Sequence, residues 1–346
     1  MNRRGGTAAA VMLLIVCSGI GGMLSSCQRG QPPVTRSPGH GPPATGRDTS
    51  LVLMGAPQVA PTAVSLIDRA AQSVDLEMYE LGRPSIITAL AAAARRGVLV
   101  KVILDPTERE SVIAARSLRS SGVRVRTLRV PGGIDHVKLL IIDRSNVLTG
   151  GVNFGTGSSY TTDVDMEFPA ADASAATEVF DQDWRASSVA SEPHTSWHPA
   201  SPASGAFYPF VTGPAIESSL LAMLGAVKAG TKCTVLANYL SDTKLLGALE
   251  NASRHGVLVD VLLNPDSYGS AAAANALGSA GAHVRMSPNH PYLHAKVLAC
   301  GELAMAGSAN FSYDGMNVNH ELDVVLSGSD AASVSALASR LFEEDA

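Results

Sequence analysis

The chain contains two near-copies of one apolar stretch, RGVLVKVILDP at residues 96–106 and HGVLVDVLLNP at residues 255–265. Each copy follows an Ala- and Leu-rich segment typical of a helix, and a glycine, Gly97 or Gly256, stands where that helix is expected to end. The repeat extends upstream to related strand-like segments that end in tyrosine. A repeat this long in only two copies indicates a duplicated domain rather than a solenoid.

Helical and strand-like patterns alternate within each copy. We expect helices at 61–72, 109–121, 216–229 and 270–280, and strands at 73–79, 98–104, 233–239 and 257–263. This alternation predicts an α/β fold with a largely parallel sheet covered by helices on both faces. The expected organisation is a first domain at 50–186, a Ser-, Pro- and Ala-rich linker at 187–204 and a second domain at 205–346.

Each copy also carries a histidine and a lysine two residues apart. The first pair is His136 and Lys138, at the start of an expected strand, and the second pair is His294 and Lys296. Side chains two apart on a strand share one face. A lone histidine on an apolar strand is usually a core residue, but burying a lysine beside it, twice, would be costly without a function.

Small-residue turns that end in asparagine follow both pairs, GGVN at 150–153 and GSAN at 307–310. Such turns can present the amides of Asn153 and Asn310 together with backbone donors. Four potentially cationic side chains and two amides that converge on one point would form a cradle for a phosphodiester. The sequence therefore predicts a phosphate site built by both halves.

The paired motifs resemble the mark of the phospholipase D superfamily, H-x-K-x4-D-x6-G-[GS]-x-N, over about residues 50–345. The matching positions are His136, Lys138, Asp143, Gly150, Gly151 and Asn153 in the first copy, and His294, Lys296, Gly307, Ser308 and Asn310 in the second. The second copy has Gly301 where the family has aspartate, and it is one residue shorter. The resemblance implies two duplicated α/β/α sandwich domains with one active site at their pseudo-twofold interface.

The resemblance also implies a reaction that needs neither metal nor cofactor. One histidine attacks phosphorus and forms a phosphohistidine, and the other protonates the leaving alcohol and then activates water or a second alcohol. It assigns His136 as the nucleophile and His294 as the general acid and base. The two lysines and the two asparagines would hold the non-bridging oxygens.

Each histidine needs a group that fixes its tautomer, usually a carboxylate. Family members carry an acid shortly after the asparagine, and Glu321 and Glu167 fit this pattern, with Asp165 as the rival of Glu167. The resemblance places Asp143 at a turn away from the phosphate, in a structural role. Gly301 would then tighten the equivalent turn in the second copy.

The N-terminus has the features of an export signal. Arg3 and Arg4 precede an apolar stretch that ends in Leu-Ser-Ser before Cys27, which resembles a bacterial lipobox. We expect a signal peptide at 1–26, lipidation of Cys27 and a Pro- and Gly-rich tether at 27–49. A plain signal peptide and an uncleaved anchor are the alternatives. The expected location is the extracytoplasmic side of the cell membrane, or the exterior if the protein is secreted.

The net charge bears on the class of ligand, and the cysteines bear on whether the chain contains a disulfide. Removing Arg3 and Arg4 from the 26 basic residues leaves 24 against 31 acidic ones, a net charge of −7. An acidic chain argues against a protein that coats nucleic acid. Cys233 and Cys300 lie in apolar runs where free cysteine is common, so we expect free thiols rather than a disulfide.

These observations favour a membrane-tethered, monomeric phosphodiesterase that acts on phospholipid headgroups by hydrolysis or transfer. An exported nuclease of the same superfamily is the alternative, with Arg95, Arg96, Arg124 and Arg126 as a possible basic rim. A phosphate- or lipid-binding protein without activity is a third hypothesis, motivated by Gly301. The headgroup is not encoded in any readable motif.

Overall fold

The computed structural model describes residues 51–168, 170–189, 203–204, 209–288 and 292–344. The predicted signal peptide, Cys27 and the tether lie outside the described residues, as does most of the predicted linker. Residues 47–346 form one compact unit. The two copies of the repeat, called the first and second halves below, both lie within it.

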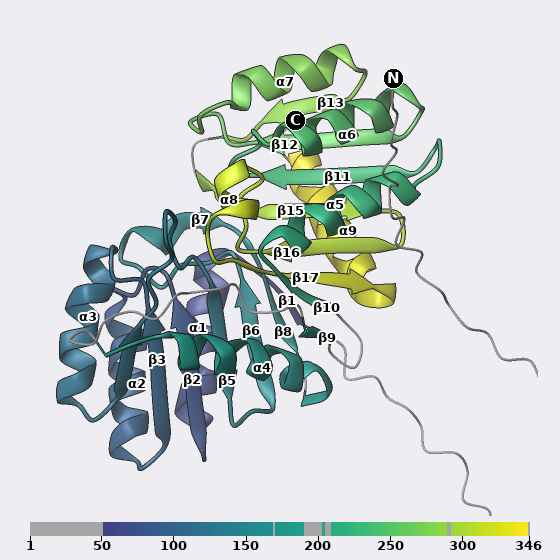
Figure 1. Ribbon diagram of the computed structural model, residues 1–346. Coiled ribbons are helices and arrows are strands. Elements are labelled where there is room, and N and C mark those ends of the chain that lie inside the picture. The colour runs from purple at the N-terminus through teal and green to yellow at the C-terminus, as the bar shows by residue number, and fades with distance from the viewer. Residues whose placement is uncertain (1–50, 169, 190–202, 205–208, 289–291, 345–346) are drawn as a thin grey trace, which may run out of the picture. The chain divides into compact units, whose positions relative to one another are not determined.

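The first half forms a seven-stranded sheet in the order β1-β8-β6-β5-β2-β3-β4 (Figure 1). The strands are β1 (Leu51–Met54), β2 (Ser73–Met78), β3 (Leu99–Leu104), β4 (Arg124–Thr127), β5 (Lys138–Ile142), β6 (Asn146–Gly150) and β8 (Val164–Phe168). The helices are α1 (Gly55–Arg69), α2 (Pro84–Arg95), α3 (Arg109–Ser120), the 3-10 turn η1 (Gly157–Tyr160) and α4 (Ala170–Ala186).

The second half repeats this plan in an eight-stranded sheet of order β13-β12-β11-β15-β16-β17-β10-β9. The strands are β9 (Ala203–Ser204), β10 (Pro209–Thr212), β11 (Lys232–Ala237), β12 (Leu258–Leu263), β13 (His283–Met286), β15 (Lys296–Cys300), β16 (Leu303–Gly307) and β17 (Leu322–Ser327). The helices are α5 (Pro214–Ala226), α6 (Thr243–Arg254), α7 (Ser270–Ser279), α8 (Tyr313–Asn317) and α9 (Gly328–Glu344). Two short strands, β7 (Thr161–Thr162) and β14 (Tyr292–Leu293), pair with each other across the halves.

The duplicated α/β architecture is confirmed, but the expectation of a largely parallel sheet was wrong. Within the two large sheets, as far as the structure describes them, parallel pairing is confined to β2-β3-β4 and β11-β12-β13. The motif strands β5 and β15 run antiparallel to β2 and β11. Each continues through a tight turn into β6 or β16, and short turns join antiparallel strands whereas parallel strands need a long crossover.

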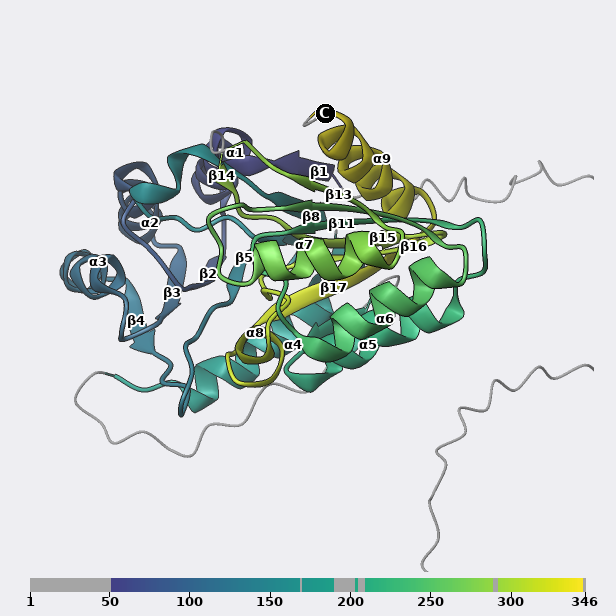
Figure 2. The same ribbon diagram turned by 90° about the horizontal axis from the view of Figure 1, so that it is seen from above.

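Apolar side chains fill three buried clusters. One lies beneath α1, α2 and α3, and a second lies beneath α5, α6 and α7. The third joins the halves and includes Phe168 and Phe180 from the first and Phe210 and Phe342 from the second. Figure 2 shows α9 on the side of the second sheet opposite α5, α6 and α7. Burial of each such side chain contributes about 1.5–3 kcal/mol, so this shared core stabilises the contact that builds the site.

The turn after each motif strand is fixed in a different way. Asp143 has a positive φ of 50°, and its carboxylate accepts hydrogen bonds from the backbone N–H groups of Ala71, Gln72 and Ser73. Gly301, the equivalent residue, has a φ of 62° and no carboxylate to offer. Asp143 therefore ties the end of β5 to the start of β2, as expected of a structural residue.

A disulfide lies at the corresponding corner of the second half. Cys233 and Cys300 face each other in the β11–β15 register and are bonded, so the expectation of free thiols was wrong. Strand pairing brings them together with a Cα–Cα distance of 4.1 Å, and this pairing could not be read from their separate apolar runs. Cys300 directly precedes Gly301, so the disulfide fastens the corner that lacks the aspartate.

None of the helices in the described part of the chain combines the length and the apolar character needed to cross a bilayer.

Candidate active site

The two motif histidines are held by carboxylates from the opposite halves. His136 Nδ1 lies 2.8 and 2.9 Å from the carboxylate oxygens of Glu321. His294 Nδ1 lies 2.9 and 3.2 Å from those of Asp163. Because an ionised carboxylate can only accept, each Nδ1 is assigned as the donor, which leaves Nε2 free for chemistry.

Backbone hydrogen bonds between the halves bring these pairs together. The His136 N–H donates to the carbonyl of His320 at 2.8 Å, and the His320 N–H donates to the carbonyl of Ile134 at 2.9 Å. In the other pair, the His294 N–H donates to the carbonyl of Thr162 at 2.9 Å, beside the short β7–β14 pairing. Each histidine is thus fixed by its backbone as well as by its ring.

Glu167 does not have the predicted role. It lies on β8 opposite Leu148, in the register that pairs β8 with β6, and it is only partly buried. Asp163, four residues earlier, occupies the position that reaches His294. Spacing alone does not choose, because Asp163 and Asp165 follow Asn153 by 10 and 12 residues whereas Glu321 follows Asn310 by 11. The strand register chooses Asp163, since D-V-D at 163–165 aligns with E-L-D at 321–323 on the Gly150–Asp165 and Gly307–Asp323 pairs.

The second acid of each of these triplets supports the asparagine turn. Asp165 accepts a hydrogen bond from the Val152 N–H at 3.2 Å, and Asp323 accepts one from the Ala309 N–H at 3.0 Å. Burial raises the pKa of Asp165 to about 8 and that of Asp323 to about 7. Asp165 is therefore a turn-supporting residue and does not bind His294.

The glycines of the motifs make room for these acids. A Cβ at Gly150 would lie 2.5 Å from the Asp165 Cα, and one at Gly307 would lie 2.5 Å from the Asp323 Cα. A Cβ at Gly151 would lie 2.3 Å from Oδ1 of Asp163. Any side chain at these positions would displace the carboxylates that the site depends on.

Ser308, the counterpart of Gly151, contacts the carboxylate of its own half. Its hydroxyl donates to Glu321 Oε2 at 2.6 Å and accepts a hydrogen bond from the Leu322 N–H at 2.9 Å. Asn319 Nδ2 also donates to Glu321, at 3.3 Å. Glu321 is therefore oriented by three groups: Ser308, Asn319 and His136.

The two lysines are buried in the same site. Lys138 Nζ donates to the carbonyl of His136 at 2.7 Å, and Lys296 Nζ donates to the carbonyl of His294. Burial lowers the pKa of Lys138 to about 7 and that of Lys296 to about 8. Glu321 and Asp163 oppose the effect of burial on both lysines, and the charge of Lys296 lowers the pKa of Lys138 further. A phosphate between them would restore their full charge.

The electrostatics distinguish the two histidines. Burial, followed by the charges of Lys138 and Lys296, lowers the pKa of His136 well below its usual value. Burial also lowers the pKa of His294, but Asp163 opposes this shift. His136 is therefore the more strongly neutral ring, which suits a nucleophile, and His294 is better able to hold a proton.

The two supporting carboxylates are also unequal. Burial raises the pKa of Glu321 to about 7, with Lys138 opposing the shift. Burial acts in the same direction on Asp163, but His294 and Lys296 outweigh it, so the pKa of Asp163 lies below its usual range. His294 thus has the fully ionised partner.

The two motif asparagines differ in their hydrogen bonds. Asn153 is nearly buried, and its Oδ1 accepts no hydrogen bond from the described residues. Asn310 Oδ1 lies 3.4 Å from the donor Nδ2 of Asn238. These amides follow β6 and β16 directly.

Sequence reasoning missed two tyrosines beside the histidines. The Tyr79 ring lies edge-on to His136, with centroids 4.9 Å apart, and Lys138 Nζ lies 5.4 Å from the Tyr79 centroid. The Tyr292 ring lies 6.5 Å from that of His294. The tyrosine that ends the repeated LEMY segment was a usable signal for Tyr79, whereas Tyr292 belongs to no repeated motif.

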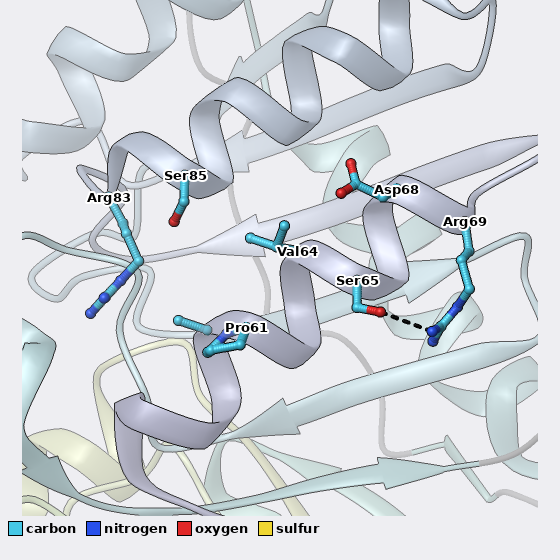
Figure 3. A pocket seen from close by; sticks show the side chains of 8 residues that line it. Pro61, Val64, Ser65, Asp68, Arg69, Arg83 and Ser85 are labelled. Carbon is cyan, nitrogen blue, oxygen red and sulfur yellow. Dashed lines mark hydrogen bonds between the residues drawn. The ribbon is translucent and has the colours of Figure 1, made fainter.

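A hollow of about 530 Å³ lies on the surface between α1 and the start of α2 (Figure 3). Its lining includes Asp68, Arg69 and Arg83, and Arg69 is bonded to Ser65. It holds none of the motif residues, so we do not assign the phosphodiester chemistry to it.

Comparison with known proteins agrees with this geometry. The family model described as the phospholipase D-like domain of cardiolipin synthase matches residues 63–184 and again 223–345. The chain is 38% identical to a phospholipase D of Rickettsia felis over 89 residues, which is 25% of this chain and 44% of that protein. It is 28% identical to cardiolipin synthase A of Klebsiella pneumoniae over 295 residues, covering 72% of this chain and 60% of that one.

Among solved structures, the fold is similar to that of phosphatidylserine synthase from Haemophilus influenzae. The TM-score is 0.66 at 11% identity, with 86% of each chain covered. At this identity the likeness concerns the fold alone.

Proposed function

The chain belongs to the phospholipase D superfamily of phosphodiesterases, and we propose that it cleaves phospholipid headgroups through a phosphohistidine on His136. The observation that carries the proposal is the crossed pairing of His136 with Glu321 and of His294 with Asp163, beside two buried lysines. Each motif histidine takes its carboxylate partner from the other half.

In the first step, Nε2 of His136 attacks phosphorus and the bond to the headgroup oxygen breaks. His294 donates its Nε2 proton to that oxygen, so the headgroup leaves as a neutral alcohol. Lys138 and Lys296 hold the non-bridging oxygens as charge builds on them. Glu321 accepts the Nδ1–H of His136 throughout and stabilises the positive charge on the phosphorylated ring.

In the second step, His294 takes a proton from water or from a second alcohol. The resulting oxygen attacks phosphorus, and the P–N bond to His136 breaks. Water gives phosphatidate and an alcohol gives a new phosphodiester. In both reactions, His136 and His294 return to their starting protonation states.

Exposed tyrosines around the site support a phospholipid substrate. Tyr160 is 76% exposed and directly precedes the β7 strand beside His294, and Tyr313 is 64% exposed and lies three residues after Asn310. Tyr268 is 88% exposed and follows Ser267, whose hydroxyl bonds Asn238. Tyrosine favours membrane–water interfaces, where its ring is apolar and its hydroxyl is wet.

A nuclease is the second candidate, favoured by arginine-lined hollows on α3 and β4. Arg119 lines both hollows, Arg116 and Arg129 line one, and Arg124 lines the other. Two arginines of the predicted basic rim are already engaged, because Arg96 donates to the carbonyl of Ile67 and Arg126 donates to that of Trp184. We therefore favour the lipid substrate.

Headgroup release from vesicles tests the proposal. Purified protein is incubated with vesicles that contain phosphatidylcholine, phosphatidylethanolamine and phosphatidylglycerol, with and without ethanol. We expect release of a headgroup, formation of phosphatidylethanol with ethanol, and loss of both in His136→Ala. Cleavage of plasmid or single-stranded DNA without any lipid turnover would favour the nuclease, and inactivity on both substrates would favour a binding protein.

A further inference from the structure

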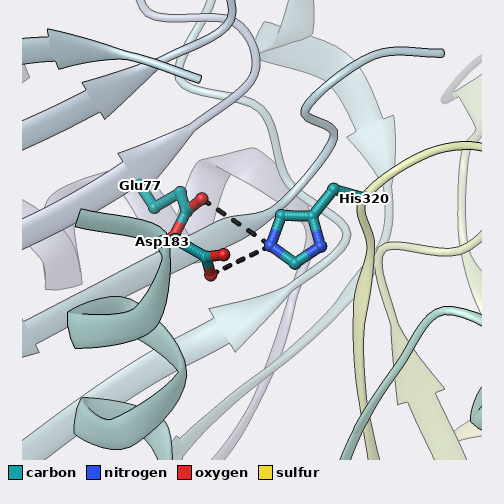
Figure 4. Close-up of side chains that lie close together, drawn as sticks. All are labelled: Glu77, Asp183 and His320. Carbon is teal, nitrogen blue, oxygen red and sulfur yellow. Dashed lines mark ion pairs between the residues drawn. The ribbon is translucent and has the colours of Figure 1, made fainter. Parts of the chain in front are cut away.

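A second cluster of ligand-type side chains lies beside the active site, on the other side of the segments that carry it. Glu77 on β2, Asp183 on α4 and His320 before β17 point toward one another (Figure 4). His320 Nε2 lies 2.9 Å from Asp183 Oδ2 and 3.9 Å from Glu77 Oε1. All three are buried, and one ligand atom of each lies within 4.8 Å of the others.

Asp135 adds a fourth buried group. It pairs with His320 through a backbone bridge, and its side chain lies against that of Glu77. Both carboxylate oxygens of Asp135 and both of Glu77 are buried and lack a donor in good hydrogen-bonding geometry among the described residues, although the two carboxyl groups lie close enough to share a proton. Each buried acceptor left unsatisfied in this way costs about 1–3 kcal/mol, and more if it is charged.

The negative charge of a neighbouring acid on the same strand is balanced by two cationic side chains. Asp75 lies two residues before Glu77 and thus on the same face of β2. Lys101 Nζ is 3.8 Å and Arg144 Nη2 is 3.9 Å from its carboxylate. Among the described residues, Glu77 forms its ion pair with His320. Asp183 contacts the same histidine, so the two acids share it. The cluster is short of positive charge.

The donor set matches one kind of cation. Carboxylate oxygens with a single imidazole nitrogen suit zinc, whereas calcium and magnesium favour oxygen ligands alone, and calcium takes six to eight of them. In a tetrahedral zinc site with bonds of about 2.1 Å, ligand atoms lie about 3.4 Å apart. The separations from His320 Nε2, 2.9 and 3.9 Å, lie on either side of that value.

We propose that Glu77, Asp183 and His320, with Asp135 as the fourth group, bind a zinc ion. Consecutive side chains on an extended segment point in opposite directions, so the cluster and the active site lie on opposite sides of the same segments. The ion would therefore have a structural role. His320 points into the cluster and Asp135 lies against Glu77, while the adjacent His136 and Glu321 point into the active site. The ion would fasten the His320 segment of the second half to β2 and α4 of the first. This inference stands apart from the proposed phosphodiester chemistry, which uses His136, His294 and the two lysines.

Metal content of the purified full chain tests the proposal. The protein is treated with EDTA, exchanged into zinc chloride, desalted and analysed by mass spectrometry for zinc, and its Tm is measured before and after. We expect about one zinc ion per chain and a Tm raised by roughly 5 °C or more. Glu77→Gln and Asp183→Asn should each lose the bound zinc and the Tm increase.

Asp260→Asn is the matched control. It removes another histidine–carboxylate pair, in which Nδ1 of the exposed His283 lies 3.1 Å from Oδ1 of the buried Asp260. This variant should keep its zinc. Wild-type protein that retains no zinc, or variants of Glu77 and Asp183 that retain as much as wild type, would overturn the proposal. If Glu77→Gln does not fold, the wild type and Asp183→Asn still decide the question. Headgroup release is not the readout, so an inactive enzyme leaves this test intact.

Discussion

His136 Nδ1 lies 2.8 Å from the Oε2 of Glu321, although 185 residues separate them in the chain. The two belong to different copies of the duplicated unit. The reciprocal pair, His294 with Asp163, crosses in the opposite direction at 2.9 Å. In the proposed mechanism the duplication is functional as well as structural, because each half supplies the carboxylate for the histidine of the other.

Glu321→Gln should reduce turnover sharply. The amide can still contact His136, but it removes the charge that stabilises the phosphorylated ring, and we expect kcat to fall by about 10²- to 10⁴-fold. Headgroup release at saturating lipid measures this. Glu167→Gln is the matched control on β8 and should stay within about twofold of wild type. A larger loss in Glu167→Gln than in Glu321→Gln would contradict the crossed assignment.

Asp163→Asn should change the pH dependence of the reaction. The charge of Asp163 raises the pKa of His294 against the effect of burial. Removing that charge lowers the pKa, so protonated His294 is lost at a lower pH. We expect the alkaline limb of the kcat/KM profile to move to lower pH by about one unit or more. An unchanged alkaline limb would mean that His294 is not the general acid.

The Cys233–Cys300 disulfide should stabilise the chain by a measurable amount. It closes a sequence separation of 67 residues, for which the chain-entropy relation gives about 4 kcal/mol. The double variant Cys233→Ala/Cys300→Ala should lower the free energy of unfolding in urea by about 2–5 kcal/mol. Wild-type protein treated with reductant should show a similar loss, whereas the double variant should not respond to it.

Asp143→Ala tests the corresponding corner of the first half. The carboxylate accepts three backbone N–H groups, which lower its pKa against the opposing effect of burial. Losing these bonds should cost about 1–3 kcal/mol of unfolding free energy. The effect on kcat should be small, because the turn lies at the far end of β5 from His136. A large loss of kcat in a fully folded variant would give Asp143 more than a structural role.

Asp165 should make the protein less stable as pH rises. Burial raises its folded pKa to about 8, so the folded state holds a proton that the unfolded state releases near pH 4. Its contribution is therefore fully present below about pH 4 and is lost as pH rises through about 8. Urea unfolding at pH 5 and pH 8 should show a smaller pH-dependent decline in Asp165→Asn than in wild type. An equal decline would show that Asp165 is ionised throughout.

The sequence by itself determined the duplication, most of the elements and the motif residues. These follow from local rules, since apolar runs, helix-ending glycines and residues two apart on a strand need no knowledge of distant partners. The family could be named from His136, Lys138, His294 and Lys296 together with the glycines and asparagines after them. These features can be predicted from the sequence because each depends on a few neighbouring residues.

Only the tertiary structure decided which groups meet. Strand direction, the Cys233–Cys300 bond and the choice of Asp163 over Glu167 all depend on register, where a shift of one residue turns a side chain to the other face. The crossed pairing of His136 with Glu321 depends further on how two separately folded sheets pack through a shared core. Contacts of that kind arise between residues far apart in the chain, and no local pattern in either half specifies them.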